Sequence, residues 1–122
     1  MSVTINELGC AGHFIGARNC AWRRHTQIIG SVDSFRVSSV GDYRPSDSRE
    51  AQTLGASPES FYETAVFRLT SKPAEGSEGC GCLEPVSWME MEMRRCATAG
   101  EAQRQHHAMV IKYSSLADKE QS

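Results

Sequence analysis

The sequence predicts an α+β domain in which a mostly antiparallel sheet of four or five strands is covered on one face by a C-terminal helix. Residues 20–29 and 61–69 alternate apolar and polar side chains with the period of two that is typical of half-buried strands, and residues 35–40 bring β-branched and aromatic residues. Residues 98–117 show the spacing of three and four that is typical of an amphipathic helix. The connections between the early strands hold no helical segment, which favours antiparallel hairpins over parallel crossovers.

Length and composition limit the chain to one domain, residues 1–122. Its 122 residues contain 39% hydrophobic and 23% charged residues, as in ordinary globular domains. No run approaches the roughly 18 apolar residues of a membrane-spanning helix. The first ten residues lack the basic start and apolar core of a secretory signal. We therefore expect a cytoplasmic protein without a membrane partner.

The first predicted hairpin joins the short apolar stretch 13–17 to the strand 20–29 through a turn at Arg18-Asn19. In the second strand, Arg24 is the discordant residue on the side that otherwise carries Cys20, Trp22, Thr26 and Ile28. A turn at Gly30-Ser31 then leads to the third strand, 35–40, which is expected to end at Gly41-Asp42.

The middle of the chain contains two predicted loops. Residues 44–60 hold two prolines and several serines and are expected to form an irregular connection. Residues 61–69 are the predicted central strand, and residues 71–85, rich in Gly, Glu and Ser, are the predicted flexible loop. Residues 88–95 alternate again, which predicts a strand with Met89, Met91 and Met93 on one face, more typical of adaptable core than of a recognition groove.

The final segment has a helix start signal. Thr98 and Glu101 match a capping box, and the helix is expected to end near Ala117. His106 is predicted to pack on the sheet and His107 to face water. The predicted apolar stripe consists of Ala102, His106, Met109, Val110, Tyr113 and Ala117.

Charge and cysteine usage exclude some classes of protein. The formal net charge of −2 argues against a general nucleic-acid binder, although direct contact with nucleic acid stays open. The five cysteines are an odd set without an export signal, which predicts free thiols. Cys20 and Cys96 fall within or at the end of predicted strands, as small buried hydrophobes commonly do.

The residues also fit two alternative kinds of chemistry. Cys80-Gly81-Cys82 could supply a zinc site with Cys10 or Cys20 and His13 or His25, but the spacing is one residue short of the usual knuckle. The order of Arg23 or Arg24, Ser38-Ser39 and Glu90-Met91-Glu92 resembles the arginine, serine and glutamate elements of ADP-ribosyltransferases. That resemblance would assign dinucleotide binding to the arginine and serine, and stabilisation of the cationic transition state to Glu92. The prediction adopted is no catalytic residue, no metal and no cofactor.

The predicted binding surface combines aromatic and arginine side chains, the residue types that dominate interface hot spots. The other interpretation is that Trp22 belongs to the core and that the arginines protect a strand edge. The predicted contact residues are Trp22, Arg23, Arg24, Tyr43, Arg44 and Tyr62.

Four stretches together support a family resemblance: VSSVGDYRP (37–45), FYETAVF (61–67), the CGC of the acidic loop, and TAGEAQRQHHAMVIKY (98–113). They resemble a loose family of small uncharacterised tailed-phage and prophage proteins, with departures at Ala65 and Leu83. The resemblance carries no activity. It implies a role in the bacterial host cytoplasm as an accessory protein that binds a host macromolecule, such as an inhibitor of a defence complex like an anti-CRISPR. A structural virion component is the third possibility.

Overall fold

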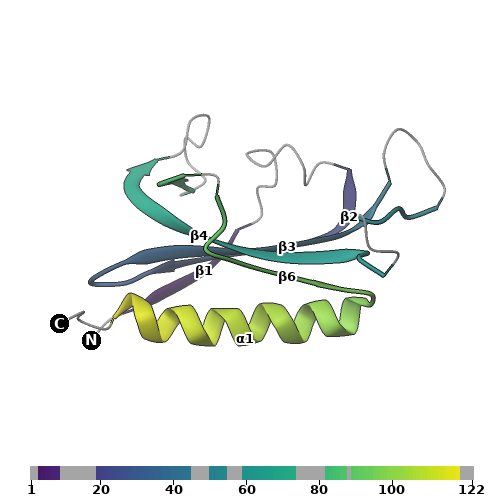
Figure 1. Cartoon of the computed structure of the whole chain (residues 1–122). Helices are drawn as coiled ribbons and strands as arrows, with labels where there is room; N and C mark the ends of the chain where they lie inside the picture. Colours follow the sequence, from purple (N-terminus) through teal and green to yellow (C-terminus); the bar gives the residue numbers. More distant parts are fainter. Residues whose placement is uncertain are drawn as a thin grey trace.

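The computed structural model describes residues 3–8, 19–44, 50–54, 59–73, 82–87 and 89–118. Over these residues the chain forms one six-stranded antiparallel sheet and one long helix (Figure 1). The strands are β1 (Thr4–Leu8), β2 (Cys20–Ile29), β3 (Ser34–Tyr43), β4 (Tyr62–Pro73), β5 (Leu83–Pro85) and β6 (Glu92–Cys96), and the helix is α1 (Ala99–Ala117). The predicted α+β class is confirmed.

The long strand β4 organises the sheet. β1, β2, β3 and β4 are consecutive antiparallel neighbours. The first half of the outer edge of β4 pairs with β6, from Tyr62↔Cys96 to Val66↔Glu92, and its second half pairs with β5 through Leu69 and Pro73. In Figure 1 the end of β4 curls away from α1, so that β5 lies on the side of the sheet opposite the helix.

The helix begins and ends where the sequence predicts. Thr98 is the N-cap, and its hydroxyl oxygen accepts the Glu101 N–H at 3.2 Å. The Thr98 hydroxyl in turn donates to the Glu101 carboxylate at 3.0 Å. The predicted stripe is buried at Ala102, His106, Met109, Tyr113 and Ala117, whereas Val110 is partly buried.

The apolar core lies under the C-terminal half of α1. Phe35 and Tyr113 meet with ring centroids 5.0 Å apart. Gly30 lies against the Ala117 carbonyl, where a Cβ would collide with backbone, and the same carbonyl accepts the N–H groups of Val32 and Asp33. The β2–β3 turn therefore holds the end of the helix. The core cluster is Ile28, Phe35, Val37, Val66, Met109, Tyr113 and Ala117.

Several strand boundaries differ from the prediction. β3 runs past Gly41 to Tyr43, and β4 continues to Pro73, because both strands have neighbours that pair with the additional residues. β1 and β5 were not predicted, since Thr4–Leu8 is mostly exposed and Leu83–Pro85 is only three residues long. The predicted strand at 13–17 lies outside the described residues.

The prediction for 88–95 is correct only in its second half. β6 starts at Glu92, and Met89 and Met91 precede it with 81% and 44% of their surface exposed. They are therefore not core residues. The connection 44–60 contains one isolated bridge, Tyr43↔Gln52, among its described residues.

The sequence predicts a cover on one face of the sheet only, but the centre of the face opposite the helix is covered as well. His25, Gln27, Arg36, Ser38 and Phe67 point to that face and are all buried. Both faces of the central strands are thus covered.

Candidate functional site

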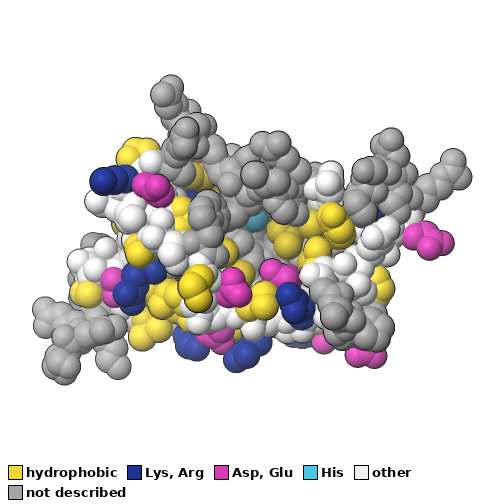
Figure 2. Space-filling model, turned by 45° about the horizontal axis from the view of Figure 1, so that its top comes forward, with side chains coloured by type: hydrophobic (Ala, Val, Ile, Leu, Met, Phe, Trp, Pro, Cys, Tyr) yellow, Lys and Arg dark blue, Asp and Glu magenta, His cyan; other side chains and the backbone are white. Residues whose placement is uncertain are grey.

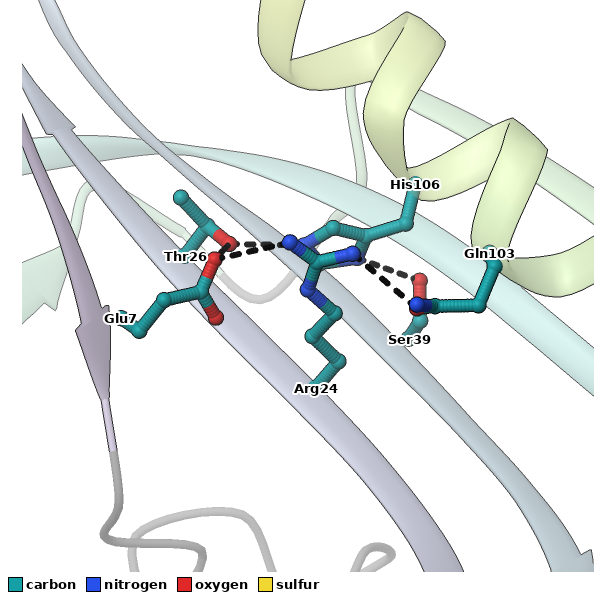
Figure 3. Close-up of polar contacts among 6 residues, drawn as sticks. All are labelled: Glu7, Arg24, Thr26, Ser39, Gln103 and His106. Carbon is teal, nitrogen blue, oxygen red and sulfur yellow. Dashed lines mark hydrogen bonds and ion pairs between the residues drawn. The ribbon is translucent and has the colours of Figure 1, made fainter.

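A chain of polar side chains lies between α1 and the sheet (Figure 3). His106 reaches down from the helix and is 0% exposed. Its Nε2 lies 2.7 Å from Thr26 Oγ1 on β2, and its Nδ1 lies 2.7 Å from Ser39 Oγ on β3. Ser39 Oγ lies 2.7 Å from Thr64 Oγ1 on β4. One imidazole thus connects the helix to the central strands. We call Glu7, Thr26, Ser39, Thr64 and His106 the His106 network.

The direction of each hydrogen bond in the His106 network follows from counting protons. Thr26 has one hydroxyl proton and donates it to the Glu7 carboxylate at 2.8 Å, so its oxygen must accept the Nε2–H of His106. Burial and the Arg24 charge lower the pKa of His106 from 6.5 to about 4, so the ring is neutral and Nδ1 is an acceptor. Ser39 therefore donates to Nδ1, and Thr64 donates to Ser39. All donors point toward Glu7.

The His106 network ends near the surface at an ion pair between Glu7 and Arg24. Arg24 donates to Glu7 at 3.2 Å and to Gln103 on α1 at 3.0 Å. Burial raises the pKa of Glu7, but the hydrogen bonds from Thr26 and Arg24 and the Arg24 charge outweigh it and lower that pKa. The discordant Arg24 of β2 is thus explained, since it closes the network at the surface.

Serine, imidazole and carboxylate in series resemble the order used in nucleophilic catalysis. Here, however, Ser39 and His106 are both 0% exposed, so no substrate can approach the hydroxyl. The geometry supports a different task. The His106 network satisfies buried polar groups and fixes the position of α1 over β2 and β3.

The opposite face carries a second polar cluster. Gln27 and Arg36 are cross-strand partners on β2 and β3. The Gln27 Oε1 accepts the Leu83 N–H at 2.9 Å, and Arg36 Nη2 donates to the Leu83 carbonyl at 2.6 Å. These bonds hold the start of β5 on the sheet. Next to them, burial and the Arg36 and Arg23 charges lower the pKa of His25 to about 4.

Three aromatic residues of the predicted contact set gather at one end of the sheet. Trp22, Gly41 and Tyr62 are aligned across β2, β3 and β4. The Tyr62 ring occupies the space that a side chain at position 41 would need, and it meets Trp22 edge to face with ring centroids 5.5 Å apart. Tyr43 ends β3. All three rings are half-buried, and we call Trp22, Tyr43 and Tyr62 the aromatic end.

The three predicted arginines are not brought together. Arg23 is exposed on the face opposite Trp22. Arg24 belongs to the edge of the His106 network, as described above. Arg44 lies beside the aromatic end with its side chain 44% exposed and pairs with Asp42 at 2.8 Å. Arg44 is thus the predicted arginine that combines exposure with this position.

A different exposed surface was missed by the sequence interpretation. Val86, Met89 and Met91, between β5 and β6, are 60%, 81% and 44% exposed. The alternation of this stretch predicts a strand, whereas Pro85 and Ser87 at its start indicate a turn.

The structure gives no support to the ADP-ribosyltransferase alternative. Ser39 is enclosed beneath the helix, and the Glu92 carboxylate accepts hydrogen bonds from Lys112 at 2.7 Å and from Tyr113 at 2.9 Å. The bond from Lys112, opposed by burial and aided by Tyr113, lowers the pKa of Glu92. Glu92 therefore links β6 to α1.

The zinc alternative rests mainly on residues that lie outside the described part of the chain, Cys10, His13 and Cys80. Among the residues that the structure describes, no group of three or more His, Cys, Asp or Glu side chains could hold a metal ion. Cys20, Cys82 and Cys96 are buried, and burial raises the pKa of the Cys20 and Cys96 thiols.

Comparison with known proteins yields no relative: the chain matches no protein-family model, no curated protein and no solved structure. Within the described residues, α1 is too polar to cross a membrane.

Proposed function

We propose that this protein is a non-enzymatic accessory protein of the tailed-phage type, which acts in the bacterial cytoplasm by binding a host macromolecule. The candidate target is a defence complex that the protein inhibits, in the manner of an anti-CRISPR. The observation that carries the proposal is the contrast between enclosed chemistry and an accessible aromatic end. Ser39 and His106 are fully buried, while Trp22, Tyr43 and Tyr62 each keep part of their surface exposed.

The aromatic end has properties that favour a contact surface. Tyr62 is fixed against Gly41 and Trp22, so its side chain loses little conformational freedom when a partner binds. Arg44, the residue after Tyr43, adds an exposed guanidinium that pairs with Asp42. Aromatic and arginine side chains contribute most of the binding energy in typical protein interfaces.

The test is capture of a partner from the bacterial host by the purified protein, followed by identification and measurement of Kd. Arg44→Glu together with Tyr43→Ala is expected to weaken binding by about thirtyfold or more, because truncating a hot spot costs about 2 kcal/mol or more. Lys72→Glu, an exposed charge reversal near the other end of β4, is the matched control and should leave Kd unchanged. Unchanged affinity in the Arg44/Tyr43 variant would contradict the proposal.

A further inference from the structure

The segment between β5 and β6 projects apolar side chains into solvent. Its described residues are Val86, Ser87 and Met89–Met91, which we call the β5–β6 segment. Met89 is 81% exposed, more than the other exposed large hydrophobic residues of the described chain. Exposed apolar side chains that cluster on one segment are typical of interaction sites, whereas scattered ones are not.

Both ends of the β5–β6 segment are fixed to the middle of β4. The Val86 N–H donates to the Arg68 carbonyl at 2.8 Å, and the Met91 N–H donates to the Val66 carbonyl at 2.7 Å. Between them, the Met89 N–H donates to Ser87 Oγ at 3.2 Å, as in a serine turn. The backbone is therefore held before any partner arrives, which reduces the entropy lost on binding.

The charged side chains within this stretch of the chain are acidic. Residues 83–91 contain two acids, Glu84 and Glu90, and no Lys, Arg or His. Both glutamates are exposed. In Figure 2, hydrophobic side chains along the front of the molecule alternate with acidic ones, and basic side chains lie on either side of them. An acidic, methionine-bearing segment fits a surface with an apolar groove and basic side chains on its rim.

We infer that the β5–β6 segment is a second docking element, which inserts Met89 and its apolar neighbours into a basic-rimmed apolar groove of a protein partner. This inference rests on the proposed function, the binding of a host macromolecule, and specifies that the macromolecule is a protein. An anionic membrane would repel Glu84 and Glu90. A second copy of the chain is disfavoured because the remaining exposed large hydrophobics of the described residues are dispersed over β1, the β2–β3 turn and α1, at Ile5, Val32 and Ile111.

The inference is tested by photocrosslinking in the bacterial host. One full-length chain carries a benzophenone amino acid at position 89 and another carries it at position 43, in the aromatic end. We expect position 89 to crosslink to one protein, at a peptide whose apolar residues are flanked by Lys or Arg. Charge reversal by Glu84→Lys with Glu90→Lys is expected to reduce that crosslink about tenfold. Glu59→Lys, an exposed charge reversal elsewhere, should not reduce it.

The outcomes separate this inference from the proposed function. Crosslinking from position 43 but not from position 89 overturns the docking element and leaves the proposed function standing, whereas silence at both positions overturns both. Crosslinks from position 89 to a second copy or to lipid, or flotation of the chain with phosphatidylglycerol vesicles, also overturn the inference. So does a crosslink that the two lysine substitutions leave unchanged.

Discussion

Both faces of the sheet carry buried polar residues, but the residues on the two faces have different kinds of hydrogen-bond partner. On the helix side, His106 meets Thr26 and Ser39 through side chains. On the other side, Gln27 and Arg36 bind the backbone of Leu83. The covering element explains the difference. The interior of a helix uses its own N–H and C=O groups internally, so it can offer only side chains, whereas a strand segment can offer its backbone.

This comparison also shows that a series of catalytic residue types is not in itself a site. The His106 network has serine, imidazole and carboxylate in order, yet it lies where water and substrate are excluded. The two proposed contact surfaces, the aromatic end and the β5–β6 segment, lie instead at an end and an edge of the sheet. If the contacts on the two faces are independent, substitutions on one face should lower stability without loosening the other.

The largest effect is expected from His106→Ala. The substitution leaves a cavity and removes the hydrogen-bond partner of both Thr26 and Ser39, so the free energy of unfolding should fall by about 4 kcal/mol. Urea unfolding measures it. The matched control is His107→Ala, an exposed neighbour on the same helix, with an expected change within about 0.5 kcal/mol. Equal effects of the two substitutions would show that the network does not hold the helix.

Low pH is expected to reduce the stability of the fold through one buried histidine on each face of the sheet. The pKa values of His25 and His106 are about 4 in the folded chain, below the usual 6.5, so the unfolded chain binds more protons between these values. Stability should therefore be complete above pH 6.5 and fall as the pH is lowered toward 4, by up to about 3 kcal/mol for each histidine. The lowered pKa of Glu7 adds to the loss at still lower pH.

The contributions of the two histidines to the pH dependence of stability can be measured separately. Replacing His106 by Gln should remove about half of the dependence between pH 6.5 and 4, and replacing His25 by Gln the other half. Thermal melts at several pH values measure this. A profile that neither substitution flattens would mean that the two imidazoles are not held neutral by the fold.

Gln27→Leu should affect only the face opposite the helix. It removes the acceptor of the Leu83 N–H and should lower the free energy of unfolding by about 1–2 kcal/mol. Hydrogen exchange at the Leu83 amide should accelerate, while amides of β3 that lie beneath α1 keep their relative protection. If amide exchange accelerates uniformly along the chain, the two faces of the sheet are not stabilised independently.

The smallest effect is expected from Thr98→Ala. Loss of the N-cap should cost about 1 kcal/mol and fray the first turn of α1 without releasing His106 two turns further on. Amide exchange at Glu101 against that at Val110 measures the difference. Thr98→Ser retains the hydroxyl and should behave as the parent chain does.

Much of the fold could be predicted because local patterns and burial agree. The period of two in residues 61–69 matches β4, since residues of this stretch have neighbours on both edges and both faces. The start at Thr98 and the end at Ala117 follow from a capping signal and an apolar stripe. The prediction failed where alternation was not accompanied by burial, at Met89 and Met91, because strand pairing with β4 begins only at Glu92.

The candidate surfaces could be predicted only in part. Trp22 and Tyr62 were expected among the contact residues, but their alignment over Gly41 depends on the register of three strands. Arg23 and Arg24, adjacent in sequence, point to opposite faces of β2 and do not act together.

The sequence by itself determined the α+β class, the helix with its cap and buried stripe, and the central strands, because each depends on contacts or periodicities within a few residues. Only the tertiary structure decided that Glu7, Thr26, Ser39 and His106 form one network, that Leu83 closes the opposite face, and that Met89 stays outside. These outcomes depend on strand register and on which segment covers each face, and both are set by contacts between residues far apart in the chain.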